Sequence, residues 1–376
     1  MCVLCDNLTS PIGRRTLLKG SAAMIAAAGV GALLPMPSSA EQATGTPVVG
    51  SGTAKAAVPA GQGPFLETVT GPVSADQIVK ACAHEHLFVD FHGPDDPNYM
   101  NVDWSDVFGA CENSVNVLRG QGVNLLIEWT NMGVGRNVML LRHVARKTGM
   151  NIVCPTGIYK SLIPPAFHEM TIPQIADVFV MELTKGIDGS AIRAGFIKIA
   201  STEKGATETD TKIHRAAAIA AKATGATISL HSPFAATTNA VVEVLTGEGF
   251  RLERFVWGHA QPSNMNDHTA MAARGATIQF DAISARSDPF FHGPTDDESM
   301  LERIENLVKA GHDDQVLVST DASVFVNPSK YQYDRDNSYL HRYFADKLKQ
   351  RLGEAAAGKV LRDNVIRAFR RGDSVT

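Results

Sequence analysis

Strand-like and helix-like segments alternate along this chain from residue 81 to residue 321, and no other feature restricts the fold as strongly. Apolar runs of strand character occur at 81–88, 124–130, 151–159, 194–201, 226–232, 255–261, 276–283 and 315–321. Segments of helical character lie between them, at 105–121, 135–148, 171–185, 209–224, 237–249, 266–274 and 298–310. Eight strands alternating with helices predict an α/β protein whose parallel sheet closes into a (β/α)8 TIM barrel. The tail from 339 to 371 predicts one or two extra C-terminal helices outside the barrel.

A doubly wound open sheet is the structural alternative. Its dinucleotide-binding version carries Gly-x-Gly-x-x-Gly after a strand, and no strand-like run here is followed by that motif. With 44% hydrophobic and 20% charged residues and a formal net charge of −4, the chain has an ordinary globular composition. This charge balance indicates neither nucleic-acid binding nor a polybasic membrane surface. Cys82, Cys111 and Cys154 lie in or beside apolar runs and predict small core residues, not a disulfide framework.

The first forty residues have the layout of an export signal. The pair Arg14-Arg15 precedes Leu-Leu-Lys, a small and apolar run follows, and Ser38-Ser39-Ala40 ends it. This order predicts a twin-arginine-type signal peptide at 1–40, hence a periplasmic or secreted protein with no stable membrane insertion after cleavage. An N-terminal membrane anchor is the alternative, although the apolar run is short for a span. Residues 41–63 predict a flexible linker before a barrel domain at 64–376.

Several strand-like runs carry a side chain that could bind a metal. His84 and His86 are separated by one residue in the first run, so both imidazoles project from the same face. Neutral imidazole is the commonest metal ligand in proteins. Later runs add four further candidates: Lys198, His231, His259 and Asp321. Taken singly, each histidine could be a packing residue and Asp321 a turn cap. Because barrel enzymes place their chemistry at the carboxyl ends of the strands, the convergence predicts a metal centre there.

Longer motifs surround these residues. They are Thr68-Val-Thr-Gly71-Pro72, His84-Glu-His86-Leu-Phe-Val-Asp, Val134-Gly-Arg136, Thr156-Gly-Ile-Tyr159, Arg193-Ala-Gly-Phe-Ile-Lys198, Leu230-His231, Gly258-His259 and Ser319-Thr-Asp321. Together they resemble the phosphotriesterase family of the amidohydrolase superfamily, the group that also contains the phosphotriesterase-like lactonases. The resemblance extends from Phe65 to the end of the eighth strand.

The resemblance implies a site for two divalent metal ions. Zinc is the expected ion, with cobalt or manganese as alternatives. The implied ligands are His84, His86 and Asp321 for a buried ion, His231 and His259 for a more exposed ion, and Lys198, carboxylated on its amine, as the bridge between them. A hydroxide shared by the ions would attack a carbonyl or phosphoryl centre. Asp321 would be its first proton acceptor.

Two positions depart from the family pattern. The sixth strand continues Ala260-Gln-Pro262, where phosphotriesterases are acidic. The seventh ends Asp281-Ala282, where relatives carry Asp-His or Asp-Arg, so the usual proton relay lacks two members. Arg286 could replace the arginine from the following loop, and a solvated loop arginine is the alternative.

Other positions bear on the substrate. Tyr159 resembles a tyrosine that lactonase relatives place beside the site, and an aromatic residue packing under the barrel rim is the alternative. Aromatic residues in the loops after the last two strands suggest a small, mainly apolar and neutral substrate. These residues are Phe290, Phe291, His292, Phe325, Tyr331 and Tyr333. Arg335, in the last of these loops, is expected to be solvated.

We therefore expect a binuclear-metal hydrolase of lactones or other carboxylic esters, with phosphotriester hydrolysis as a side activity. A true phosphotriesterase, or an amide or carbamate hydrolase, is the enzymatic alternative. A non-catalytic periplasmic binding protein on the same barrel is an alternative of another class, which the complete ligand set disfavours. The twin-arginine export machinery is the expected protein partner, and a homodimer stays open.

Overall fold

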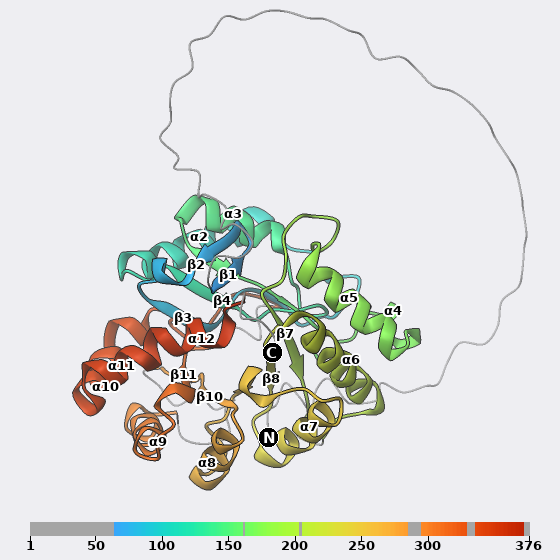
Figure 1. The fold of residues 1–376 in the computed structure, drawn as a ribbon. Helices are drawn as coiled ribbons and strands as arrows, with labels where there is room; N and C mark the ends of the chain where they lie inside the picture. The colour runs from blue at the N-terminus through green and yellow to red at the C-terminus, as the bar shows by residue number, and fades with distance from the viewer. Residues whose placement is uncertain (1–63, 161, 203–204, 285–294, 329–334, 372–376) are drawn as a thin grey trace, which may run out of the picture. The chain divides into compact units, whose positions relative to one another are not determined.

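Eight parallel barrel strands form the centre of the computed structural model, which describes residues 64–160, 162–202, 205–284, 295–328 and 335–371 (Figure 1). The strands are β3 (Ala81–Asp90), β4 (Leu125–Glu128), β5 (Asn151–Val153) with β6 (Pro155–Thr156), β7 (Phe196–Ala200), β8 (Ile228–His231), β9 (Phe255–Gly258), β10 (Thr277–Phe280), and β11 (Val316–Val318) with β12 (Ser323–Asn327). All eight predicted strand runs are present. The predicted leader and linker lie outside the described residues.

Two irregular strands close the sheet on itself. One sheet has the order β11-β10-β9-β8-β7-β6 and the other has the order β12-β3-β4-β5. They join at Cys154, between β5 and β6, whose carbonyl accepts a 2.8 Å hydrogen bond from the Gly195 amide. They join again where the Asp321 amide donates to the His84 carbonyl at 3.1 Å and the His86 amide donates to the Ala322 carbonyl at 2.9 Å. The predicted (β/α)8 barrel is thus confirmed.

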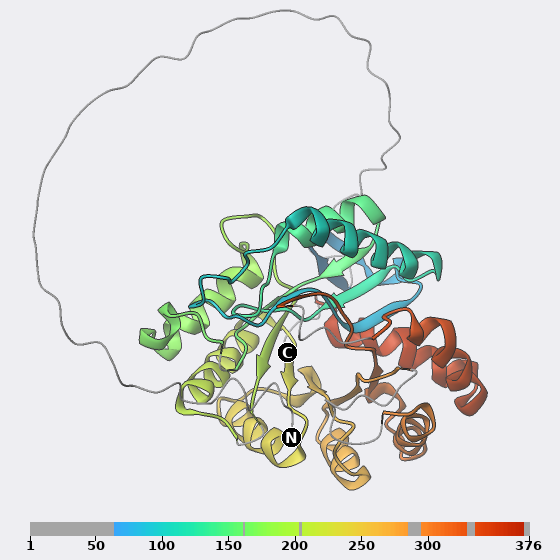
Figure 2. The same ribbon diagram turned by 180° about the vertical axis from the view of Figure 1, so that it is seen from behind.

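The helices between the strands surround the barrel (Figures 1 and 2). They are α2 (Trp104–Gly120), α3 (Val138–Thr148), α5 (Ile172–Thr184), α6 (Glu208–Thr224), α7 (Ala235–Gly247), α8 (Met265–Ala273) and α9 (Asp297–Lys309), with a short α4 (Ala166–Glu169) before α5. Gly149 and Gly225 end α3 and α6 with φ of 72° and 69°, the left-handed conformation that ends many helices. None of the described helices is both long and apolar enough to cross a membrane.

A hairpin and the C-terminal tail complete the fold. The hairpin consists of β1 (Phe65–Thr68) and β2 (Gly71–Ser74), paired antiparallel, and was not predicted. The tail contains a π-helical turn (Leu340–Phe344), α10 (Ala345–Leu352), α11 (Glu354–Gly358), a second π-helical turn (Lys359–Asp363) and α12 (Asn364–Phe369), as the tail pattern predicted. Phe369 packs on Phe196 and Trp129, with ring centroids 5.0 and 6.4 Å away. The hairpin and α12 therefore share one hydrophobic cluster with the barrel interior. Cys82, Cys111 and Cys154 are buried free thiols.

Gly157 allows the backbone after β6 to approach β7 very closely. Its φ is +106°, and a Cβ there would lie 2.0 Å from the carbonyl oxygen of Lys198. Gly109, on the exposed face of α2, has an ordinary φ, and a Cβ added there would have nothing within 4 Å. The close approach of the two backbones therefore requires glycine at 157, whereas nothing around position 109 does.

We expect Gly157→Ala to lower the free energy of unfolding by more than about 2 kcal/mol, because the added methyl group meets backbone in a left-handed conformation. Gly109→Ala should raise it by about 0.5–1 kcal/mol, since alanine suits an exposed helix better than glycine. Urea unfolding followed by circular dichroism measures both changes. Equal stability of the two variants would contradict the close approach.

Candidate metal centre

His84, His86 and Asp321 form a small triangle of ligand atoms at the carboxyl end of the barrel. Nε2 of His84 lies 3.2 Å from Nε2 of His86 and 3.2 Å from Oδ1 of Asp321, and Nε2 of His86 lies 3.1 Å from that oxygen. A tetrahedral ion with bonds of about 2.0 Å separates its ligands by about 3.3 Å. Two imidazole nitrogens and one carboxylate oxygen also suit zinc chemically. The residues present therefore fit a divalent ion.

A second pair of imidazoles adjoins this triangle. His231 ends β8 and His259 follows β9, and their ring centroids are 4.3 Å apart. The His259 ring lies 5.3 Å from that of His84, so the two pairs form one cluster. Lys198, in the middle of β7, is 2% exposed. Its Nζ lies 3.9 Å from the ring centroid of Trp129, whose other neighbour, 3.7 Å away, is the stacked His84 ring.

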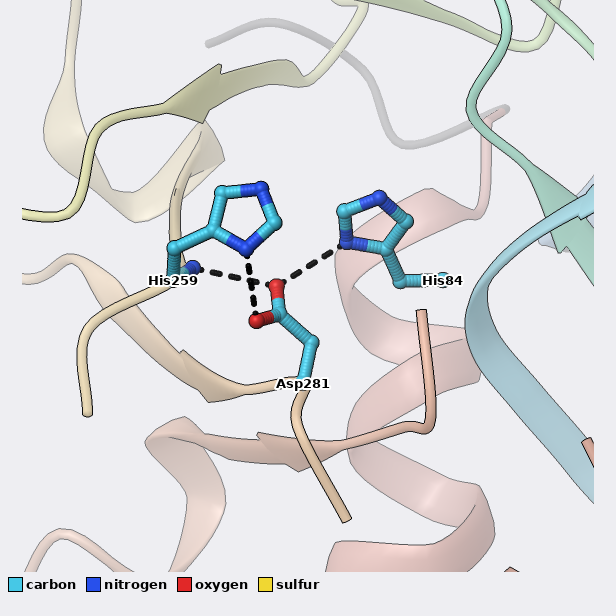
Figure 3. A group of neighbouring side chains, drawn as sticks. All are labelled: His84, His259 and Asp281. Atoms are coloured by element: carbon cyan, nitrogen blue, oxygen red, sulfur yellow. Dashed lines mark hydrogen bonds and ion pairs between the residues drawn. The ribbon is translucent and has the colours of Figure 1, made fainter. Parts of the chain in front are cut away.

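Asp281 orients one imidazole from each pair (Figure 3). Its Oδ2 accepts from Nδ1 of His84 at 2.9 Å, and its Oδ1 accepts from Nδ1 of His259 at 2.8 Å. The His259 backbone amide also donates to Oδ2 at 3.0 Å. Because Nδ1 of each ring is held, Nε2 is the nitrogen left for a metal. By distance alone, His84, His259 and Asp281 could also hold a metal ion. Their contacts, however, have the geometry of hydrogen bonds.

The other two histidines, His86 and His231, also have one ring nitrogen in contact with a neighbouring side chain. Nδ1 of His86 lies 2.8 Å from the Thr130 hydroxyl, which in turn donates to the buried Glu128 carboxylate. For His231 the held nitrogen is Nε2, which lies 3.1 Å from Nζ of Lys160 and 3.5 Å from the Tyr159 hydroxyl. Nδ1 of His84, His86 and His259 therefore faces an oxygen that can accept, the arrangement typical of metal-binding histidines. Nε2 of His231 instead faces an ammonium, which can only donate to it.

Burial sets the protonation states that metal binding needs. Burial lowers the pKa of His84 to about 3, so this imidazole is neutral near pH 7. Burial also lowers the pKa of Lys198 to about 7, although Asp321 and Asp281 act in the opposite direction. Burial alone would raise the pKa of Asp321, but the electrostatic interaction with the His84 ring, the His86 hydrogen bond and the charge of Arg335 hold it well below its usual range. Neutral imidazole, ionised carboxylate and an amine that can lose its proton are the forms that ligate or carboxylate.

Two of the six residues lie on strained backbone. His259 has φ of +62° and Asp321 has φ of +49°, and neither is glycine. Residues held in the left-handed region cost on the order of 1–3 kcal/mol and cluster at functional sites. His259 directly follows β9, and Asp321 lies in the short link between β11 and β12, so both unusual turns fall at the ends of barrel strands.

The structure gathers the six predicted ligands at one end of the barrel and places Tyr159 beside His231. Arg286 lies outside the described residues, as do the predicted substrate aromatics except Phe325. The expectation that Arg335 is solvated is wrong: its side chain is 6% exposed, and Nη1 donates to Oδ2 of Asp321 at 2.9 Å and to the Asp321 carbonyl at 2.7 Å.

Two further residues of the site were not identified from the sequence. Asp281 was recognised only as the end of a strand that lacks a relay residue. A carboxylate directly after a buried strand was the available signal, since a buried charge requires partners. Lys160, which directly follows Tyr159, was not predicted to belong to the site. A lysine at the end of a predicted buried strand was the available signal, since a buried ammonium also requires partners.

Comparisons with known proteins agree with this geometry. The family model described as "Phosphotriesterase family" matches residues 64–369. The phosphotriesterase homology protein of Escherichia coli is 31% identical over 305 residues, which cover 79% of this chain and 100% of that protein. The aryldialkylphosphatase of Saccharolobus solfataricus is 34% identical over 245 residues, covering 63% and 75%.

A solved structure is similar over the same region. A mutant phosphotriesterase-like lactonase from Deinococcus radiodurans superposes with a TM-score of 0.72 at 25% identity, covering 81% of this chain and 99% of that one. The matched region contains the barrel and every residue of the candidate centre. This protein therefore belongs to the phosphotriesterase family.

Proposed function

We propose that the protein is a binuclear-metal hydrolase of lactones or other carboxylic esters. The observation that supports this most directly is the triangle of His84, His86 and Asp321, whose edges of 3.1–3.2 Å match the ligand spacing of a tetrahedral ion. His231 and His259 would hold a second ion, and Lys198, as a carbamate, would bridge the two. Bound divalent ions supply Lewis acidity and lower the pKa of water.

The protein's own residues have separable roles in such a reaction. The Asp321 carboxylate, ionised and facing the two histidines of β3, can take the proton of the attacking water. Asp281, Thr130 and Tyr159 orient the histidines and touch no ligand position themselves. Trp129 lies beneath His84 and Lys198 and excludes water from that side.

The strand-7 end favours esters with a tethered leaving group. Ala282 cannot carry a proton, and Arg335, which contacts Asp321, donates only and cannot accept one. Among the residues given a role here, Asp321 is then the one that returns its proton to the departing oxygen. In a lactone that oxygen stays attached to the product and remains within reach. A poor leaving group of a phosphotriester would have to depart into solvent as an unprotonated alkoxide, which is slow.

The leader adds a proposal on location. The twin-arginine pattern at 1–40 supports export of the folded and metal-loaded protein to the periplasm or beyond. Twin-arginine transport carries folded proteins, which suits a centre whose ligands come from strands far apart in sequence.

We expect the purified protein to contain about two divalent ions per chain. A chelator should abolish ester hydrolysis, because the histidine and carboxylate ligands alone supply no Lewis acid, and zinc, cobalt or manganese should restore it. Elemental analysis and turnover of a lactone panel measure the two quantities. A single tightly bound ion with full activity would contradict the binuclear assignment.

Lys198→Ala should lose both ions and turnover, and a small carboxylic acid that fills the bridging position should restore part of the activity. Lys198→Arg should have no turnover, since a guanidinium stays charged and cannot ligate a cation. Lys147→Ala, on the exposed face of α3, is the matched control. Metal content and activity of the three variants are compared. An active Lys198→Arg would show that the lysine is structural.

Leaving-group dependence separates ester from phosphotriester chemistry. We expect measurable turnover of lactones or activated esters, and a phosphotriester rate that falls steeply as the leaving-group pKa rises, because Ala282 occupies the relay position that protonates the leaving group in relatives. A lactone panel and a series of aryl phosphotriesters provide the comparison. Phosphotriester hydrolysis independent of the leaving group, together with inert lactones, would instead support a true phosphotriesterase.

A further inference from the structure

Lys160 is a buried cation beside the metal centre that the six-ligand set does not use. It directly follows Tyr159, just beyond β6, and is 4% exposed. Its Nζ lies 3.1 Å from Nε2 of His231 and 5.8 Å from the ring centroid of Tyr159. The Tyr159 hydroxyl lies 3.5 Å from the same imidazole nitrogen. An ammonium, a phenol hydroxyl and an imidazole edge therefore converge on one place.

The charge of Lys160 opposes further positive charge nearby. After burial, which is the main cause, the positive charge of Lys160 contributes to the lowered pKa of His231 and of Lys198. A buried ammonium is costly unless other groups compensate it. A side chain that only filled space at this position would not need a charge. A bound anion beside Nζ would add to this compensation.

The tautomer of His231 defines what that ligand must be. If Nδ1 of a neutral imidazole binds a metal, the proton is on Nε2, which then acts as a hydrogen-bond donor. Nε2 of His231 then no longer accepts from the Lys160 ammonium 3.1 Å away, and both groups, with the Tyr159 hydroxyl, present N–H or O–H donors at the same place. Three converging donors, one of them cationic, form a site for an oxyanion and repel a cation.

A second cation adjoins the ligand set. The Arg335 guanidinium, 6% exposed, lies against Asp321. The two cations therefore contact the ligand set at His231 and at Asp321, and both favour negative charge in a bound molecule. By contrast, the one described aromatic of the predicted substrate loops, Phe325, lies in β12 opposite Phe88, with ring centroids 6.0 Å apart.

We propose that Lys160, together with Tyr159, forms an oxyanion-binding subsite beside His231, so that the substrate is an ester or lactone bearing a carboxylate or similar anionic group. This replaces the neutral substrate suggested by the sequence and rests on the proposed hydrolase function. Recognition is by the permanent charge of the substrate, which is present before and after the bond breaks. Lys160 is therefore expected to act mainly on KM and on product binding.

The first experiment uses a pair of aryl esters with the same leaving group, one with a free carboxylate on the acyl chain and the other with that carboxylate as its methyl ester. We expect the wild-type protein to favour the anionic ester in kcat/KM. Lys160→Met should lower the anionic-to-neutral ratio about 10- to 100-fold through KM, the size of one charge-assisted hydrogen bond. Lys160→Arg should keep most of the preference, and Lys147→Met on exposed α3 should leave it unchanged.

A binding measurement provides a readout apart from turnover. Calorimetric titration of the zinc-loaded protein with succinate should give a Kd that rises about 10- to 100-fold in Lys160→Met and changes little in Lys147→Met. Should Lys160→Met fail to fold, the wild-type preference between the two esters and the Lys160→Arg variant still decide the question.

The outcomes separate this proposal from the function it rests on. Equal kcat/KM for the two esters in the wild-type protein, or a succinate Kd that Lys160→Met leaves unchanged, would overturn the subsite while the hydrolase stands. Equal losses of kcat for both esters in Lys160→Met would also overturn it, since they indicate stabilisation of the reacting oxygen. Lys160-dependent succinate binding without hydrolysis of either ester would support the subsite and refute the hydrolase.

Discussion

The carboxylate of Asp281 joins the two halves of the candidate centre (Figure 3). A fully buried carboxylate is stable only when its oxygens are well supplied with donors. Here the donors are Nδ1 of His84, Nδ1 and the backbone amide of His259, and, at 3.3–3.4 Å, the side-chain amides of Gln261 and Gln279. One side chain therefore sets the ring orientation of a histidine on β3 and of a histidine after β9. The ligand geometry of both pairs depends on this interaction.

The remaining contacts extend this constraint to the rest of the barrel. Trp129 lies between His84, on which its ring stacks, and Phe369 of α12. Its indole N–H donates to the Ala83 carbonyl at 2.8 Å, which fixes the ring against β3. The side of the centre formed by Trp129 is therefore apolar, while the buried cations Lys160 and Arg335 contact it at His231 and Asp321. Such a division is expected where ions and a water molecule must be held in a dry pocket.

Much of the fold could be predicted from the sequence, because buried parallel strands read as apolar runs and helices as periodic ones. The six ligand candidates could be recognised without the family resemblance, because each is a polar side chain within or at the end of an apolar strand-like run. The hairpin of β1 and β2 and the role of Asp281 were not predicted, since they depend on partners far away in the chain. The error at Arg335 has the same cause: a charged loop residue looks solvated until the fold brings Asp321 to it.

The ends of the described chain meet beneath the barrel. The backbone of Arg371 exchanges hydrogen bonds with Phe65, at 2.7 and 3.0 Å, and its guanidinium donates to the Leu183 carbonyl at 2.8 Å. During synthesis these contacts can form only after Arg371 has emerged from the ribosome. Until then Trp129 lacks Phe369 beneath it, and the nascent barrel exposes apolar surface to chaperones. The helix that completes the apolar base of the candidate centre is thus the last element of the described chain to be synthesised.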